Sequence, residues 1–317
     1  GYGEWDVEKM RHSRQVGRKE RRTNRANIIG TTINVSPTRA LPVFLRMRRT
    51  EQGRLFFTMN KIALITGATS GIGEACARAF AKNGYDLILT GRNQVRLNQL
   101  TAELAHLNVD VVTLCFDVRH REEATKAVES LDERWRNVDV LVNNAGLALG
   151  LEPEYEGSFD DWDTMIDTNI KGLLTMTRLI VPGMVARNRG HIINIGSVAG
   201  DAAYANGNVY CATKAAVKAL SDGLRVDLVD TAVRVTTVKP GLVQTNFSVT
   251  RFHGDQDRAH HVYDGIQPLT GDDIADVVLY AAQAPQHVQI AEVLVLATHQ
   301  ANGSTISRNA ARNESLS

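Results

Sequence analysis

The chain has 317 residues, and its 36 Lys and Arg nearly balance its 35 Asp and Glu, leaving a formal net charge of +1. This balance argues against a strongly basic nucleic-acid-binding protein. No apolar run reaches the roughly 18 residues that a membrane-spanning helix needs, so we expect neither nucleic acid nor a membrane as a partner. The three cysteines form no C-x-x-C pair, which argues against a disulfide framework or a cysteine-rich zinc site and favours a reducing, cytoplasmic compartment.

The first 58 residues differ from the rest, because they hold 13 Lys or Arg against five Asp or Glu. No sustained helical or strand period runs through Gly1–Thr58, and so polar a stretch buries too little apolar surface to fold alone. We interpret residues 1–58 as a basic leader that is disordered or lies outside the native domain, which then starts at Met59. A transit peptide and a nucleic-acid-binding arm are the alternatives. Residues 301–317 form a polar tail rich in Ser, Asn and Ala.

From Met59 onward, short apolar runs alternate with longer segments of helical length. The apolar runs predict strands at Ile62–Ile65, Leu87–Leu89, Val109–Leu114, Val138–Val142, His191–Ile195, Val233–Val238 and Glu292–Leu296. The segments between them predict helices at Ile72–Asn83, Gln94–Leu107, Arg121–Trp135, Phe159–Asn188, Val209–Asp230 and Asp272–Ala284. Continuous apolar strands are typical of a parallel sheet that is covered on both faces. We therefore predict one α/β domain over residues 59–300, a Rossmann-type doubly wound parallel sheet of about seven strands with helices on both faces.

A glycine-rich turn, Thr66-Gly-Ala-Thr-Ser-Gly-Ile-Gly73, follows the first predicted strand. Gly67 permits a tight turn, Gly71 lets the backbone approach a phosphate, and Gly73 lets the next helix pack closely on the strand. The helix N-terminus then offers free N–H groups to the phosphates. A turn without a ligand is the alternative, but the position at the start of a βαβ unit favours a dinucleotide. The candidate phosphate-binding residues are Gly67, Thr69, Ser70, Gly71, Ile72 and Gly73.

The second predicted strand ends at Thr90-Gly91-Arg92, and no acidic residue lies between Leu87 and Ala102. A site selective for NAD would place Asp or Glu here to bind the adenine ribose. Arg92 instead offers a positive charge to the ribose 2′-phosphate, so we predict NADP(H) as the cofactor. The alternative is a solvated arginine at a strand end.

Two further strand ends supply candidate cofactor contacts. Asp117 and Val118 follow the third strand, where by analogy of position they could meet the adenine ring. The tetrapeptide Asn143-Asn-Ala-Gly146 follows the fourth strand, and amides at such a position can line a ligand crevice. By itself the tetrapeptide could equally be an ordinary turn. The candidates from it are Asn143, Ala145 and Gly146.

The fifth predicted strand runs into Gly196-Ser197, and Tyr210 and Lys214 follow. Tyr and Lys four residues apart share one face of a helix. An ammonium near a phenol favours the phenolate and lowers the tyrosine pKa, so such a tyrosine can exchange a proton near neutral pH. Ser197 can donate a hydrogen bond to a substrate carbonyl. Each feature alone is weak, and their combination with the glycine turn carries the prediction.

The motifs at Thr66–Gly73, Asn143–Gly146, Ser197 and Tyr210-x-x-x-Lys214 together resemble the short-chain dehydrogenase/reductase family over about residues 60–300. Asn169 and Pro240-Gly241 agree with this pattern. The resemblance implies hydride transfer between nicotinamide C4 and a carbonyl or alcohol carbon. It further implies the other roles: Tyr210 as general acid or base, Lys214 tuning Tyr210 and holding the nicotinamide ribose, Ser197 polarising the carbonyl, Asn169 positioning a relay water, and Pro240, Gly241, Val243 and Thr245 contacting the cofactor.

Longer stretches resemble one group within that family, the NADP-dependent 3-hydroxy acid dehydrogenases. They include Asn143–Pro153, Asp161–Asn169, Gly190–Ser197 and Pro240–Val243. The resemblance implies serine, L-allo-threonine, 3-hydroxypropionate or malonic semialdehyde as the small-molecule substrate. It also implies a homotetramer built on the two long predicted helices.

A buried substrate carboxylate needs a cation, and Arg251 is the candidate, because it lies in the segment expected to cover the substrate and arginine binds carboxylates bidentately. A solvated loop arginine is the alternative. His253, His260 and His261 lie in the same loop, but a metal site would need fixed geometry around them, and we expect no metal. Two other functions remain open: a related reductase acting on a ketone, sugar or 3-oxoacyl substrate, and a non-catalytic NADP-binding sensor.

Overall fold

The computed structural model describes residues 27–28, 31–32, 46–49, 55–58 and 60–308. The chain divides into two compact units, Gly1–Thr58 and Met59–Ser317. In the first unit, β1 (Asn27–Ile28) pairs with β2 (Thr31–Thr32), and β3 (Arg46–Arg49) pairs with β4 (Leu55–Thr58), both antiparallel. The sequence predicted no strand here, because strands of two to four residues are too short to show an alternating pattern. The rest of the predicted leader, and the tail after residue 308, lie outside the described residues.

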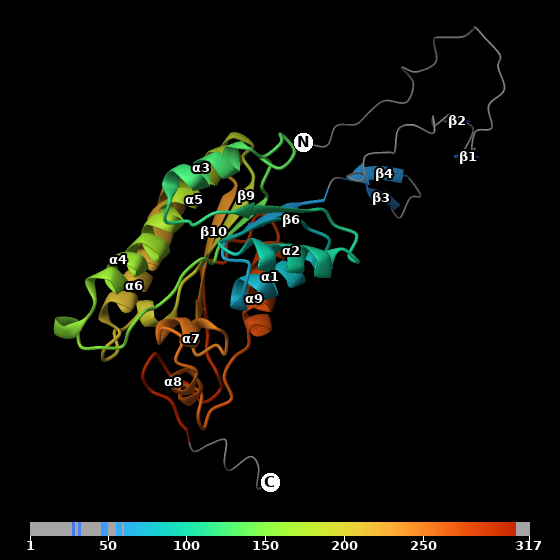
Figure 1. Cartoon of the computed structure of the whole chain (residues 1–317). Helices are drawn as coiled ribbons and strands as arrows, with labels where there is room; N and C mark the ends of the chain where they lie inside the picture. The colour runs from blue at the N-terminus through green and yellow to red at the C-terminus, as the bar shows by residue number, and fades with distance from the viewer. Residues whose placement is uncertain (1–26, 29–30, 33–45, 50–54, 59, 309–317) are drawn as a thin grey trace. The chain divides into compact units, whose positions relative to one another are not determined.

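The second unit is built on a parallel sheet of seven strands in the order β7-β6-β5-β8-β9-β10-β11. The chain steps outward from β5 to β7, returns to the other side of β5, and continues outward to β11 (Figure 1). The predicted doubly wound, Rossmann-type fold is thus confirmed. The strands are β5 (Ile62–Ile65), β6 (Asp86–Gly91), β7 (Val111–Cys115), β8 (Val140–Asn143), β9 (Gly190–Ile195), β10 (Val233–Pro240) and β11 (Glu292–Val295).

Helices cover both faces of this sheet (Figure 1). Alternate residues of β5 enter different cores: Ala63 and Ile65 join one cluster, whereas Ile62 and Leu64 join the other. The first cluster contains residues of α1 (Gly71–Lys82), α2 (Gln94–Leu104) and α9 (Gly271–Gln283). The second contains residues of α3 (Arg121–Glu129) and α5 (Leu173–Ala186). Burial on both sides explains why these strands are continuously apolar.

The long helix predicted at Phe159–Asn188 is in fact three segments. These are α4 (Phe159–Ile166), the π-helical segment η3 (Asp167–Gly172) and α5. A single π-helical turn inside a longer helix has no residue signature of its own, so the pattern alone predicts one helix. The helix α6 (Asn208–Asp227) packs against α4 and η3. The helix predicted at Arg121–Trp135 ends earlier, at Glu129, with Trp135 buried in the turns beyond it.

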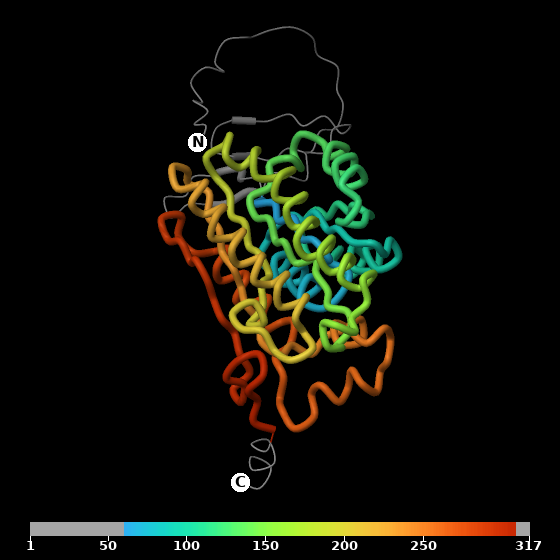
Figure 2. The backbone as a smooth tube through the Cα atoms, turned by 90° about the vertical axis from the view of Figure 1, so that its left-hand side faces the viewer, coloured from blue at the N-terminus to red at the C-terminus, as the bar shows by residue number. Residues whose placement is uncertain are grey.

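Two segments extend beyond the carboxyl ends of the strands (Figures 1 and 2). One holds the short helices α7 (Phe247–Arg251) and α8 (Gln256–His261). The other is the last described stretch, which follows β11. Arg308 joins the two, because its guanidinium donates hydrogen bonds to the carbonyls of Val262 (3.2 Å) and Asp264 (2.5 Å). Residues 301–308 therefore pack on the domain.

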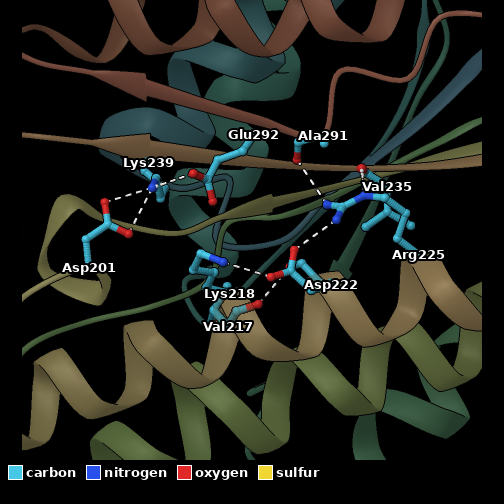
Figure 3. Close-up of polar contacts among 10 residues, drawn as sticks. Asp201, Val217, Lys218, Asp222, Arg225, Val235, Lys239, Ala291 and Glu292 are labelled. Atoms are coloured by element: carbon cyan, nitrogen blue, oxygen red, sulfur yellow. Dashed lines mark hydrogen bonds and ion pairs between the residues drawn. The ribbon is translucent and has the colours of Figure 1, made fainter.

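Ion pairs tie the edge of the sheet to its neighbours (Figure 3). Lys239 of β10 contacts Asp201 (2.7 Å) and Glu292 of β11 (2.6 Å), and its side chain is only 6 % exposed. Arg225 of α6 pairs with Asp222 (2.8 Å) and donates to the carbonyl of Ala291 (3.1 Å), directly before β11. Although burial opposes the charge, the two carboxylates raise the pKa of Lys239.

Candidate active site

A cleft of about 640 Å³ lies at the carboxyl ends of the parallel strands, where ligands bind in doubly wound folds. Most of the residues predicted from the sequence line it, from segments scattered along residues 67–251. They are Gly67, Thr69, Ser70, Gly71, Ile72, Arg92, Asp117, Val118, Ala145, Gly146, Ser197, Tyr210, Lys214, Pro240, Gly241, Val243, Thr245 and Arg251. Three predicted residues do not line it, Gly73, Asn143 and Asn169.

The glycine turn has the geometry that its sequence predicts. Gly67 adopts a positive φ of 64°, which favours glycine. At Gly73, a Cβ atom would come within 2.3 Å of the Gly67 carbonyl oxygen, so only glycine fits there. Gly73 therefore acts from behind the cleft, by letting α1 approach the turn. The helix begins at Gly71, and its N-cap Ser70 makes no side-chain capping hydrogen bond, which leaves the first N–H groups facing the cleft without that partner.

Asn144, rather than Asn143, holds the turn in place. Its amide nitrogen donates to the carbonyls of Thr66 (2.9 Å) and Gly67 (3.2 Å), and the residue lines the cleft. Asn143 is buried in the sheet, where it donates to Thr177 (3.2 Å) and Asn194 (2.9 Å). Side chains alternate along a strand, and the sequence did not show which of two adjacent asparagines faces the ligand side.

Arg92 and Asp117 lie at one end of the cleft. The Arg92 side chain is 60 % exposed, and its Nη1 lies 3.6 Å from an oxygen of Asp117. Arg119 approaches the same carboxylate more closely, at 2.8 Å. Burial favours protonation of Asp117, but its hydrogen bonds with Arg119 outweigh burial and lower its pKa. Because Arg119 already neutralises Asp117, the charge of Arg92 remains available at the cleft.

Ser197, Tyr210 and Lys214 meet at the centre of the cleft. Ser197 caps the short helix η4 (Val198–Gly200), where its hydroxyl accepts a hydrogen bond from the Ala199 N–H (3.1 Å). Tyr210 lies in the first turn of α6, and its ring packs against Phe247 at 5.6 Å between centroids. Lys214, one turn later, donates to the carbonyl of Ile195 (2.9 Å).

Burial dominates the electrostatics of Tyr210. Burial raises the pKa of Tyr210, and the groups that oppose this rise are the Ser197 hydroxyl and the charge of Arg251. Lys214 was expected to lower it, but its Nζ lies 5.9 Å from the centroid of the tyrosine ring. Burial also lowers the pKa of Lys214, to about 8. Burial thus disfavours both charged forms, the phenolate of Tyr210 and the ammonium of Lys214. The positive charge of Arg251 opposes the effect of burial on the pKa of Tyr210.

Asn169 lies behind the cleft, in the π-helical segment. Its side chain bonds the backbone of Leu147 twice, accepting from N–H (2.9 Å) and donating to C=O (2.8 Å), and it donates to Thr213 (3.0 Å). These contacts fix the strand end that carries Gly146. Its proposed relay water stays a prediction.

The far wall of the cleft contains residues that the sequence analysis did not select. Tyr204 comes from the loop before α6, and Phe247 and Tyr263 from the segment around α7 and α8. The last described residues contribute Gly303, Ser304, Ile306 and Arg308. No local pattern marks these residues, because segments far apart in the chain bring them to the cleft: Tyr204, Phe247 and Tyr263 come from segments before β11, and Gly303 to Arg308 from the stretch after it.

The described residues contain neither a metal-binding cluster nor a membrane-spanning helix. No group of three or more His, Cys, Asp or Glu among them could hold a metal ion. His253 instead pairs with Asp161 (3.0 Å). In this part of the chain, no helix is both long and apolar enough to cross a membrane.

The fold and the cleft define a nucleotide-binding α/β protein, and comparison with known proteins gives its family. A family model described as short chain dehydrogenase matches residues 61–256. The chain belongs to this family, as its motifs predicted.

The chain is 53 % identical over 240 residues to the "NADP-dependent 3-hydroxy acid dehydrogenase YdfG" of Salmonella typhi, an alignment that covers 75 % of this chain and 96 % of that protein. It is 42 % identical over 253 residues to the "NADP-dependent 3-hydroxy acid dehydrogenase" of Schizosaccharomyces pombe, covering 79 % and 98 %. Among solved structures, the closed form of serine dehydrogenase complexed with NADP+ matches with a TM-score of 0.73 and 49 % identity. That match covers 77 % of this chain and 97 % of the other.

Proposed function

We propose that this protein is an NADP-dependent oxidoreductase that transfers hydride between NADP(H) and a small 3-hydroxy or 3-oxo acid. The observation that carries the proposal is one cleft with Arg92 at one end, Tyr210 beside Ser197 at the centre, and Arg251 next to them. The family and its 3-hydroxy acid dehydrogenase relatives support it. Serine, L-allo-threonine, 3-hydroxypropionate and malonic semialdehyde are the substrates that we propose.

The residues of the cleft fit a dinucleotide phosphate. The N-terminus of α1 suits a pyrophosphate, and the space at Gly73 exists only because no Cβ fills it. In this proposal Gly67, Gly71 and Ile72 hold the pyrophosphate and Arg92 the 2′-phosphate. Asp117 and Val118 meet the adenine, and the remaining cofactor contacts are Thr69, Ser70, Ala145, Gly146, Tyr210, Lys214, Pro240, Gly241, Val243 and Thr245. The nicotinamide ring supplies or accepts the hydride.

The protein's own part of the reaction is to bind the substrate and move one proton. Ser197 donates a hydrogen bond to the carbonyl oxygen and so stabilises the negative charge that develops there. Tyr210 gives its phenolic proton to that oxygen in reduction and removes it in oxidation. Its neutral form is the stable one, because burial raises its pKa. Arg251 holds the substrate carboxylate, and Lys214 holds the ribose.

An absorbance assay tests this proposal. NADPH formation is followed with L-serine, L-allo-threonine and 3-hydroxypropionate, and NADPH loss with malonic semialdehyde, each beside NAD(H). We expect NADP-linked turnover of the acids, reduced about 10²–10⁴-fold in Tyr210→Phe because the proton donor is lost, while NADPH binding remains. Turnover of uncharged ketones or 3-oxoacyl substrates, without turnover of the acids, would show that the substrate is not a 3-hydroxy acid. NADPH binding without turnover of any substrate would support a non-catalytic sensor.

We also propose a homotetramer in the cytoplasm. Large apolar side chains are exposed on the two long helical segments, Leu174 and Val185 on α5 and Val226 on α6, and exposed apolar patches mark protein interfaces. The cysteines Cys76, Cys115 and Cys211 are free, as in a reducing compartment. Light scattering should give a mass of four chains of 34.8 kDa, and cell fractionation should place the protein in the cytoplasm. A monomeric mass would contradict the homotetramer, and recovery of the protein with membranes would contradict the cytoplasmic location.

A further inference from the structure

Arg251 is held among three aromatic rings that line the cleft. The central carbon of its guanidinium lies 5.1 Å from the centroid of Tyr210, 5.5 Å from that of Phe247 and 5.7 Å from that of Tyr204. Its backbone is fixed as well, because the Arg251 carbonyl accepts a hydrogen bond from the Gly150 N–H (3.0 Å). The cation therefore lies beside the phenol that exchanges the proton.

One hydroxyl sets the orientation of this guanidinium. The Nη2 of Arg251 donates to the Tyr204 hydroxyl at 2.5 Å. The Tyr204 ring is itself packed against Gly207, where a Cβ atom would come within 2.1 Å of the ring, and the Gly207 N–H donates to the Tyr204 carbonyl (3.1 Å). A ring packed directly on the backbone in this way offers a fixed acceptor to a long, flexible side chain.

The rest of the guanidinium has hydrogen-bonding capacity left. The Nε of Arg251 is buried and has no partner among the described residues. Nε has almost no exposed surface, so an incoming carboxylate does not reach it. With Nη2 bonded to Tyr204, Nη1 is the guanidinium nitrogen left to bind an incoming acid.

We infer that Tyr204 is the positioning residue of the carboxylate-binding arginine, and that its hydroxyl sets the affinity for charged substrates by orienting Arg251. The inference rests on the proposed function and deepens it, since the substrate must carry the carboxylate that Arg251 binds. Tyr204 does not itself exchange a proton with the substrate. Its loss should therefore weaken substrate binding and leave the chemical step nearly unchanged.

Kinetics on 3-hydroxypropionate with the full chain test this inference. In Tyr204→Phe, which keeps the ring and removes the hydroxyl, we expect KM to rise about tenfold with kcat changed less than about twofold. Tyr280→Phe is the matched control. It also removes a tyrosine hydroxyl, but Tyr280 lies on α9, is 70 % exposed and does not line the cleft, so KM should stay within about twofold.

A double-mutant cycle shows whether Tyr204 acts through Arg251. Arg251→Met removes the charge and keeps the aliphatic stem, and Tyr204→Phe should have no further effect on KM in that background. Additive effects, an equal KM in wild type and Tyr204→Phe, or a fall in kcat alone would each overturn the inference. If the wild type turns over none of the acids, the proposed function itself fails. If the wild type turns them over and Tyr204→Phe behaves like it, only the inference about Tyr204 fails.

Discussion

At the scale of single residues, we expect Arg92 to decide which nicotinamide cofactor the cleft favours. Its side chain is 60 % exposed at the cleft, and Arg119 rather than Arg92 makes the close ion pair with Asp117. A guanidinium that is only loosely paired within the protein can bind a phosphate bidentately. The sequence also lacks an acidic residue at the neighbouring positions, where NAD-selective sites hold the ribose.

We expect Arg92→Ala to raise KM for NADP about 10- to 100-fold and to leave KM for NAD nearly unchanged, because only NADP carries the extra phosphate. Steady-state kinetics with both cofactors measure this. Arg96→Ala is the control, since Arg96 pairs with Glu74 (3.2 Å) and does not line the cleft. An unchanged preference in Arg92→Ala would show that another group binds the phosphate.

A second residue-scale prediction concerns His191 in β9, which is 2 % exposed. Burial lowers its pKa from 6.5 to about 3, and the charge of Arg234 adds to this. The unfolded chain therefore binds a proton between these pH values that the folded chain does not bind, and stability falls as pH falls below about 6.5.

The slope that His191 contributes is about 1.4 kcal/mol per pH unit, so lowering the pH from 7.5 to 5 should cost about 2 kcal/mol through this residue. Urea unfolding at the two pH values measures it. We expect His191→Gln to lose most of this difference and the exposed variant His106→Gln to retain it. Equal pH dependence in all three proteins would contradict the assignment.

At the scale of elements, the buried cation of β10 stabilises the edge of the sheet (Figure 3). Lys239→Met leaves Asp201 and Glu292 without their shared partner. Because both carboxylates are about one-third exposed, we expect a loss of about 1–3 kcal/mol, less than for a fully buried pair. Chemical denaturation measures the free energy of unfolding.

The control for this prediction is Lys218→Met in α6, since Lys218 pairs with Asp222 (2.8 Å) on an exposed surface. Removing that pair should leave the free energy of unfolding nearly unchanged, because exposed ion pairs contribute little to stability. A loss of equal size in both variants would show that burial of Lys239 adds nothing to the ion pair.

At one helical element, the backbone differs from the structure that the sequence pattern predicts. The stretch from Phe159 to Ala186 has one apolar face, yet the backbone changes to a π-helix between Asp167 and Gly172. Asn169 lies in that segment, where both its oxygen and its nitrogen bond Leu147. Such local unwinding is frequent at functional sites, and the residue types alone do not mark it.

At the scale of the whole molecule, the described residues that line the cleft all come from residues 67–308. We therefore expect a chain that begins at Met59 to fold and to keep kcat/KM within about twofold of the full chain, because both cores and the cleft are built from later residues. Thermal unfolding and the NADPH assay measure this. Loss of folding or of turnover would show that the predicted leader belongs to the native domain.

Much of the fold follows from local patterns. All seven predicted strands occur, and most strand ends lie within two residues of the prediction, as at Ile62–Ile65 and Val233–Pro240. The glycine turn and the spacing of Tyr210 and Lys214 were equally readable, because turns and one helix face depend only on neighbours in the chain. The pairs at β1 to β4 were missed, since strands so short carry no period.

By itself, the sequence determined the parallel sheet, the turn that opens α1, and the residues at the centre of the cleft. Only the tertiary structure decided that Asn144 faces the turn, that Arg251 lies beside Tyr210, and that Tyr204 holds that arginine. The physical reason is distance along the chain. Tyr204 and Arg251 are 47 residues apart, and the contact between them, like the burial that sets each pKa, exists only once the segments pack together.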